Sequence, residues 1–281
     1  MSTVNVSMGG VIEAGPFVRV HDSGPVRVVT LVRPERHNAL VPELIDGVRA
    51  ALSETARDPG VRAVVLAAEG TNFSTGGDVG EFAARSGAER ADYARRIVGG
   101  LNAMMLDLIG LDVPVVTAVQ GAVTGGSIGL VLASDIVLLA PDATFAPYYV
   151  DVGFSPDGGW TALLPGRIGP TRAMSVQLSN DVIDARDALA WGLANDVVSG
   201  DVREAAMTRA RSFAEKRPAS VRRTKRLLWG DVAGIAARLD AELESFVEEI
   251  VTAEATAGMA AFLGRSQRQD NESNVEESHH G

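Results

Sequence analysis

The clearest signal of fold in this chain comes from residues 113–140, which read VPVVTAVQGAVTGGSIGLVLASDIVLLA. A β-branched apolar run at 113–119 leads into a glycine-rich turn at 120–129, which opens into a short helical stretch at 130–134 and then a second apolar run at 135–140. Apolar runs of this length are typical of buried strands. A helix between two strands implies a crossover connection, so we expect parallel pairing in an α/β fold.

The alternation of strand and helix extends toward both ends of the chain. Because the apolar runs are nearly continuous in valine, both faces of the sheet are expected to be covered. Further runs lie at 26–32 and 61–67, and the segments 42–57 and 91–111 have helical apolar spacing. Beyond about residue 184 the strands fade, and successive helices are expected at 185–191, 201–217, 219–229 and 233–264.

The chain is expected to form one domain, because no linker rich in proline or serine interrupts it. We expect an α/β core at 17–200 and a helical C-terminal region at 201–264. Residues 1–16 are small and polar and are expected to be flexible. The polar tail 265–281 is expected to be disordered, because it has too few apolar side chains to bury.

Composition and charge exclude several classes of protein. The 281 residues are 46% hydrophobic and 22% charged, as in a globular chain with a sizeable core. Cysteine is absent and the four histidines form no zinc-binding pattern, so no disulfide or metal site is expected. The net charge of -10 argues against nucleic acid as a partner. The apolar runs are too short to span a membrane and the first residues show no secretion signal, so we expect a cytoplasmic protein with no membrane partner.

Two glycine-rich turns follow strands, where an open α/β sheet binds its ligands. They are NFSTGGDV at 72–79 and QGAVTGGSIG at 120–129. Glycine lets backbone amides approach a ligand, and a helix N-terminus adds positive charge to the second turn. The alternative for each is a tight strand-to-helix turn without a ligand. Residues 125–129 also fit the G-x-S-x-G elbow of α/β-hydrolases. That fold needs a later histidine, and only His279 and His280 in the tail follow, so a serine hydrolase is not expected.

Four segments carry a resemblance to a known family. They are RPERHNAL at 33–40, FSTGGDV at 73–79, GAVTGGSIG at 121–129 followed by SDI at 134–136, and GFSPDGGW at 153–160. In this order and spacing they resemble the enoyl-CoA hydratase/isomerase (crotonase) family over roughly residues 17–264. The resemblance implies a crotonase-like spiral of ββα units, a helical C-terminal trimerisation region, and a homotrimer or dimer of trimers. It also implies an acyl-CoA thioester substrate, with coenzyme A as part of the substrate and no other cofactor.

The resemblance further implies an oxyanion hole formed by backbone amides. It places the two N–H donors at Gly77 and Gly126, beside Gly76 and Gly125 in the same turns. Two fixed donors stabilise the charge that develops on the thioester oxygen, each by ~3 kcal/mol. Asp78 is also matched and is expected beside the substrate, where it orders the loop rather than reacts.

The chain departs from the hydratases of this family at both of their glutamates. By position, these residues would fall at Gly129 and Tyr149. What remains is Asp157, in the turn PDGGW. Isomerase branches of the family, such as the ring-epoxide isomerases of phenylacetyl-CoA breakdown, carry a carboxylate at the matching place. A double-bond shift needs only one base, so Asp157 and an oxyanion hole are sufficient for isomerisation; alternatively Asp157 caps the next helix.

Other residues are secondary candidates. Arg36 is matched where a cation could meet the CoA phosphates, or is a solvated turn residue. Tyr148 and Tyr149 could line the acyl pocket and favour a flat or aromatic acyl group, or could be ordinary packing. Glu81 and Asp151 are reserve carboxylates.

The function expected from the sequence is that of an enoyl-CoA isomerase, which shifts a double bond or isomerises a ring through a thioester enolate stabilised by the oxyanion hole. Three alternatives stay open. They are an enoyl-CoA hydratase with non-standard acid and base groups, a non-catalytic acyl-CoA-binding protein, and a thioester hydrolase or dehalogenase in which Asp157 is the nucleophile.

Overall fold

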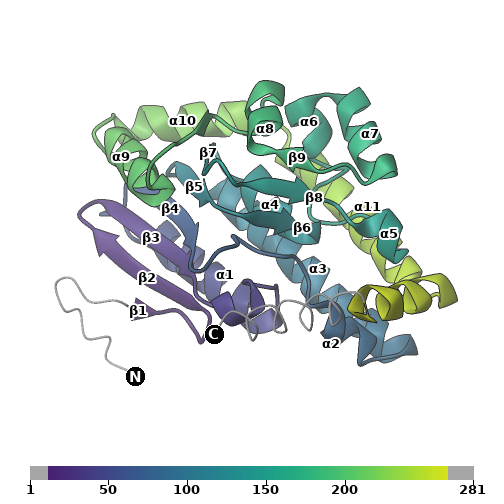
Figure 1. Ribbon diagram of the computed structural model, residues 1–281. Helices are drawn as coiled ribbons and strands as arrows, with labels where there is room; N and C mark the ends of the chain where they lie inside the picture. Colours follow the sequence, from purple (N-terminus) through teal and green to yellow (C-terminus); the bar gives the residue numbers. More distant parts are fainter. Residues whose placement is uncertain (1–11, 265–281) are drawn as a thin grey trace, which may run out of the picture.

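A seven-stranded sheet runs through the computed structural model, which describes residues 12–264 (Figure 1). Its strands, in spatial order, are β1 (Ile12–Glu13), β2 (Val18–Ser23), β3 (Val26–Leu31), β4 (Ala63–Ala68), β5 (Val115–Val119), β7 (Ile136–Leu139) and β10 (Asp196–Val197). The first three strands pair antiparallel, whereas all pairs from β3 to β10 are parallel. The parallel pairing expected from the crossover pattern is confirmed.

A second, three-stranded sheet lies beside the first and carries part of the candidate site. It consists of β6 (Ala122–Thr124), β8 (Thr144–Ala146) and β9 (Ile183–Asp184). Strand β6 belongs to the glycine-rich turn after β5, so this turn is itself part of a sheet. No pattern in the sequence predicted this second sheet, because each of its strands is only two or three residues long.

Helices cover both faces of the main sheet, as the valine-rich runs predict. On one face, α1 (Pro42–Arg57) and α3 (Gly87–Gly110) bury Leu44, Ile45 and Leu101 against alternate strand residues such as Leu66. On the other face, the remaining strand residues pack against α9 (Val202–Ala214). Alternation of side chains along each strand thus produces two separate apolar cores.

The remaining helices connect the strands and form the C-terminal region. These are η1 (Pro34–Arg36), α2 (Val79–Ala83), η2 (Gly125–Ser127), α4 (Ile128–Leu132), α5 (Tyr149–Val152), α6 (Leu164–Ile168), α7 (Pro170–Ser179), α8 (Ala185–Trp191), α10 (Pro218–Trp229) and α11 (Val232–Glu249). No helix within residues 12–264 is long and apolar enough to cross a membrane.

The structure corrects two expectations near the ends of the chain. The single helix expected at 233–264 is broken at 250–252, and a new helix begins at 253. The Thr252 hydroxyl accepts a hydrogen bond from the amide of Ala255 at 3.1 Å, which caps this last helix. At the other end, Ile12–Glu13 pairs with β2, so the segment expected to be flexible up to residue 16 joins the sheet from residue 12. Residues 1–11 and the tail 265–281 lie outside the described part of the chain.

Candidate active site

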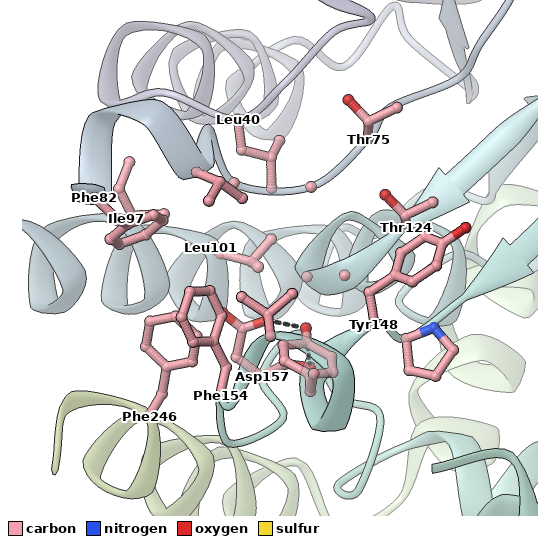
Figure 2. Close-up of a pocket in the computed structure, with 18 of the residues that line it drawn as sticks. Leu40, Thr75, Phe82, Ile97, Leu101, Thr124, Tyr148, Phe154, Asp157 and Phe246 are labelled. Atoms are coloured by element: carbon pink, nitrogen blue, oxygen red, sulfur yellow. Dashed lines mark hydrogen bonds between the residues drawn. The ribbon is translucent and has the colours of Figure 1, made fainter. Parts of the chain in front are cut away.

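A cavity lies where the two glycine turns meet α5, the turn after α5 and the C-terminal helices (Figure 2). Figure 2 shows Phe82, Phe154 and Phe246 on one side of it and Tyr148 on the other, with Asp157 between them in this view. The three phenylalanine rings meet edge to face, with centroids 5.5 to 6.5 Å apart. The walls are therefore largely apolar and aromatic.

The two glycine turns lie side by side although they are far apart in sequence. The amide of Ser74 donates to the carbonyl of Ala122 at 3.3 Å, and the amide of Thr124 donates back to Ser74 at 3.1 Å. Gly76 has a φ of +79°, and a Cβ there would lie 2.6 Å from the Thr124 carbonyl oxygen. Only glycine suits this conformation and this close approach.

The amides of Gly77 and Gly126 are the donors expected in the oxyanion hole, and both residues line the cavity. Within residues 12–264, the amide of Gly77 has no hydrogen-bond acceptor. Gly126 lies in the first turn of η2, where amides have no acceptor inside the helix. The two N–H groups are therefore available to a ligand, and Gly76 and Gly125 lie beside them in the cavity wall.

Asp157 is a buried carboxylate in the wall of this cavity. Its side chain is packed over Gly126, where a Cβ would lie 2.5 Å from Asp157 Oδ1. The hydroxyl of Tyr149 donates a hydrogen bond to the same Oδ1. Burial raises the pKa of Asp157 to about 7, although the Tyr149 hydrogen bond opposes this rise, and the negative charge of Glu242 adds to it.

Tyr149 remains a hydrogen-bond donor at neutral pH. Burial, followed by the charge of Asp157, raises the pKa of the Tyr149 phenol well above its ordinary value. Its neighbour Tyr148 has a left-handed backbone, with φ +62°, and its amide donates to Asn180 Oδ1 at 2.7 Å. Tyr148 and Tyr149 both line the cavity, but only Tyr149 is bonded to Asp157.

The two positions that carry glutamates in the hydratases are occupied by other atoms. Tyr149 fills one of them. At Gly129, a Cβ would lie 2.6 Å from the Met105 sulfur and 3.1 Å from the Gly158 carbonyl oxygen. The space that a glutamate side chain would need at position 129 is therefore filled by α3.

The structure separates the remaining candidate residues from the cavity. Asp78 caps α2 by accepting the Gly80 amide at 3.2 Å, and it accepts from Arg36 at 2.9 Å. Although burial opposes it, the hydrogen bond from Arg36 holds the pKa of Asp78 below its ordinary value. The Arg36 side chain is still 57% exposed, and its contact with CoA phosphates remains a prediction. Glu81 and Asp151 are exposed and do not line the cavity.

Residues from the C-terminal region complete the site, and sequence reasoning missed them. Phe246 of α11 and Phe262 of the last helix line the cavity. Glu242 of α11 contacts the turn that carries Asp157. No local signal marks these residues, because they lie on ordinary amphipathic helices. Within residues 12–264 no group of three or more acidic or histidine side chains could hold a metal ion.

Comparisons with known proteins agree with this fold. The family model for enoyl-CoA hydratase/isomerase matches residues 22–272. A Thermus thermophilus protein described as an enoyl-CoA hydratase is 35% identical over 210 residues, which cover 74% of this chain and 81% of that protein. The 4-chlorobenzoyl coenzyme A dehalogenase-2 of an Arthrobacter species is 31% identical over 182 residues, which cover 65% of this chain and 66% of the dehalogenase.

A solved structure of similar fold confirms the expected architecture. The enoyl-CoA hydratase/isomerase of Mycobacterium paratuberculosis superposes with a TM-score of 0.81 at 30% identity, covering 87% of this chain and 98% of that chain. This chain is therefore a member of the enoyl-CoA hydratase/isomerase family, whose members act on acyl-CoA thioesters.

Proposed function

We propose that this protein is an enoyl-CoA isomerase that moves a double bond in an acyl-CoA thioester, with Asp157 as the proton carrier. One observation carries the proposal. Among the described residues that line the cavity, Asp157 is the only carboxylate, and it is packed against Gly126 of the candidate oxyanion hole. One carboxylate is sufficient for a proton shift, whereas addition of water also needs a group that holds and activates the water.

The reaction proposed for Asp157 moves one proton between two carbons. The ionised carboxylate takes a proton from the α-carbon of a 3-enoyl thioester, and the electron pair of the C–H bond moves into the thioester. The negative charge that forms on the carbonyl oxygen is stabilised by the amides of Gly77 and Gly126. Asp157 then returns the proton to the γ-carbon, which gives the conjugated 2-enoyl thioester without gain or loss of atoms.

The electrostatics of the cavity support a proton carrier. A general base is most effective when its pKa lies close to the working pH, because it then both accepts and releases the proton readily. Burial brings the pKa of Asp157 to about 7. The hydratase alternative is weaker, because Tyr149 and Met105 occupy the places of the two hydratase glutamates.

The test is an assay of the purified protein on paired thioesters, a 3-enoyl-CoA and crotonyl-CoA. Isomerisation is followed by the absorbance of the conjugated product, and incorporation of deuterium from D2O at the α- and γ-carbons identifies the proton transfer. Asp157→Asn is expected to lower turnover about 100-fold or more. Asp151→Asn, the same change at an exposed carboxylate, is the control and should retain activity. Unchanged turnover in Asp157→Asn would refute the proposal, and rapid hydration of crotonyl-CoA would favour the hydratase.

A second candidate function uses Asp157 as a nucleophile. The observation that favours it is the similarity to the Arthrobacter dehalogenase, together with the aromatic wall formed by Phe82, Phe154 and Phe246. An Asp157 oxygen would attack the ring carbon that bears chlorine in a chlorobenzoyl thioester, chloride would leave, and water would hydrolyse the aryl ester. Chloride release and an aryl adduct on Asp157 after a single turnover would support this function. Binding of every thioester without any turnover would indicate a binding protein.

Assembly as a homotrimer or dimer of trimers is part of the proposal. It is supported by exposed apolar side chains on two helices, Met174 and Leu178 on α7 and Leu227 and Leu228 on α10. Large apolar side chains grouped on a surface are typical of subunit contacts. Light scattering on the purified protein is expected to give three or six times the chain mass, and a monomer would contradict this part.

A further inference from the structure

Glu242 is a buried carboxylate that holds the turn following Asp157. Its side chain is 4% exposed, and within residues 12–264 it forms no ion pair. Its Oε1 accepts hydrogen bonds from the amides of Thr161 and Ala162 at 2.7 and 2.9 Å and from the Thr161 hydroxyl at 2.7 Å. Its Oε2 accepts the amide of Gly159 at 2.8 Å. One side chain of α11 thus binds the amides of three of the four residues at 159–162, all except that of Trp160.

The geometry fits the ionised form of Glu242. Both oxygens act as acceptors, and three of their four partners are amides that can only donate. Burial raises the pKa of Glu242, but the hydrogen bonds from Thr161, Gly159 and Ala162 oppose that rise. Burying a carboxylate is costly unless such donors surround it. A shorter neutral side chain could cap a turn at lower cost, so the charge and the length of Glu242 need a further explanation.

The turn itself explains why a fixed support is needed. Gly158 and Gly159 follow Asp157 with φ values of +62° and +85°. A Cβ at Gly158 would lie 2.4 Å from the Gly126 carbonyl oxygen, so the turn is in close contact with the second glycine turn. Two successive glycines have large conformational freedom, which must be removed to keep the Asp157 carboxylate in one place.

We propose that Glu242 is a positioning residue, which fixes the turn at 159–162 and thereby holds the Asp157 carboxylate over Gly126. The inference rests on the proposed role of Asp157 as proton carrier. With this role for Glu242, helix α11 supports the active site as well as contributing Phe246 to its wall. Membership of the enoyl-CoA hydratase/isomerase family does not by itself imply this role for Glu242.

The charge of Glu242 gives the proposal a second, electrostatic consequence. The titratable groups that face Asp157 are Tyr149 from α5 and Glu242 from α11, while α3 presents Met105 to Gly159 and Leu101 to Gly126. Arg238, one turn before Glu242 in α11, donates to the Ala162 carbonyl oxygen at 3.2 Å. Because a nearby negative charge disfavours a second one, Glu242 keeps Asp157 protonated to a higher pH than a neutral residue would.

The experiment compares three variants of the full-length protein. Glu242→Gln keeps the shape of the side chain but removes its charge and places an NH2 group against the Gly159 amide. Glu242→Asp keeps the charge but shortens the side chain. Glu244→Gln is the matched control, because Glu244 is exposed on the same helix. For each variant, kcat and KM for the 3-enoyl thioester are measured against pH, and the Asp157 carboxyl is titrated by carbon-13 NMR, with Asp157→Asn used for assignment.

The expected results separate positioning from simple stabilisation. In Glu242→Gln, kcat falls about 10-fold or more with little change in KM, and the pKa of Asp157 falls by about 0.5 unit or more. In Glu242→Asp, kcat falls while the pKa of Asp157 stays high. An unchanged pKa and pH profile in Glu242→Gln, with only a lower melting temperature, would show that Glu242 is a structural cap and overturn the proposal.

One further variant and the NMR titration keep the proposal testable if Glu242→Gln does not fold or the wild-type protein is inactive. If Glu242→Gln does not fold, Thr161→Val removes one hydrogen bond to Glu242 and retains the rest. It is then expected to lower kcat by a smaller factor, and unchanged kinetics would overturn the proposal. The NMR titration needs no turnover, so an inactive wild-type protein would refute the proposed isomerase function without deciding the effect of Glu242 on Asp157.

Discussion

The hydroxyl of Tyr149 is expected to set the pH at which Asp157 becomes active, and Tyr149→Phe tests this directly. The substitution removes one oxygen and leaves the ring that fills the cavity wall. In the wild-type protein this hydroxyl donates to Asp157 Oδ1, which favours the ionised carboxylate. Without it, the buried carboxylate loses a donor and ionises at higher pH.

The size of the effect follows from the strength of the lost hydrogen bond. A hydrogen bond to a charged group contributes about 1.5–3 kcal/mol, and about 1.4 kcal/mol corresponds to one pH unit. The pKa of Asp157, about 7 in the wild-type protein, should therefore rise by about 1 to 2 units. Since Asp157 must be ionised to accept a proton, activity near neutral pH should fall about 5- to 50-fold and recover as the pH is raised.

The assay is kcat/KM for the 3-enoyl thioester as a function of pH, which reports the pKa of the free enzyme. Tyr148→Phe is the control: Tyr148 lines the same cavity but has no hydrogen bond to Asp157, so the acidic limb of its profile should stay in place. An acidic limb that stays in place, or moves to lower pH, in Tyr149→Phe would refute the reasoning about this pair.

Three further predictions concern the same cavity. Burial raises the pKa of Asp157 from 3.8 to about 7, so the protonated carboxyl favours the folded state. This contribution to the free energy of unfolding is fully present below the unfolded-state pKa of 3.8 and is lost as the pH rises through about 7. Asp157→Asn should therefore be more stable than the wild-type protein in urea unfolding at alkaline pH, by a margin on the order of 4 kcal/mol that disappears near pH 4; equal stability at alkaline pH would contradict this. Gly126→Ala places a Cβ 2.5 Å from Asp157 Oδ1, so it should abolish turnover and cost about 1–3 kcal/mol in thermal unfolding. In contrast, Gly110→Ala should change neither turnover nor thermal unfolding, because a Cβ at Gly110 would have no atom within 4 Å. Gly129→Glu should not hydrate crotonyl-CoA, because its Cβ would lie 2.6 Å from the Met105 sulfur; measurable hydration would show that α3 can move aside.

Much of the fold could be predicted because its signals are local. The helix predicted at 42–57 has these bounds in the structure, and that at 185–191 does as well. Strand β5 and its glycine-rich turn also lie where the apolar run and the glycines predicted them. Strand β6 was not predicted, because it is only three residues long. The break before the last helix was not predicted either; there, the Thr252 side chain caps the start of a new helix.

The sequence by itself determined that this is an α/β protein of the enoyl-CoA hydratase/isomerase family, with two glycine turns and one candidate carboxylate, Asp157. Apolar periodicity and glycine turns are properties of neighbouring residues, so they are readable along the chain. Only the tertiary structure decided that Tyr149 bonds to Asp157, that Met105 fills the space beside Gly129, and that Glu242 holds a turn 83 residues away in sequence. Such contacts depend on how whole elements pack together, because a buried polar group finds its partner wherever packing brings a donor within reach.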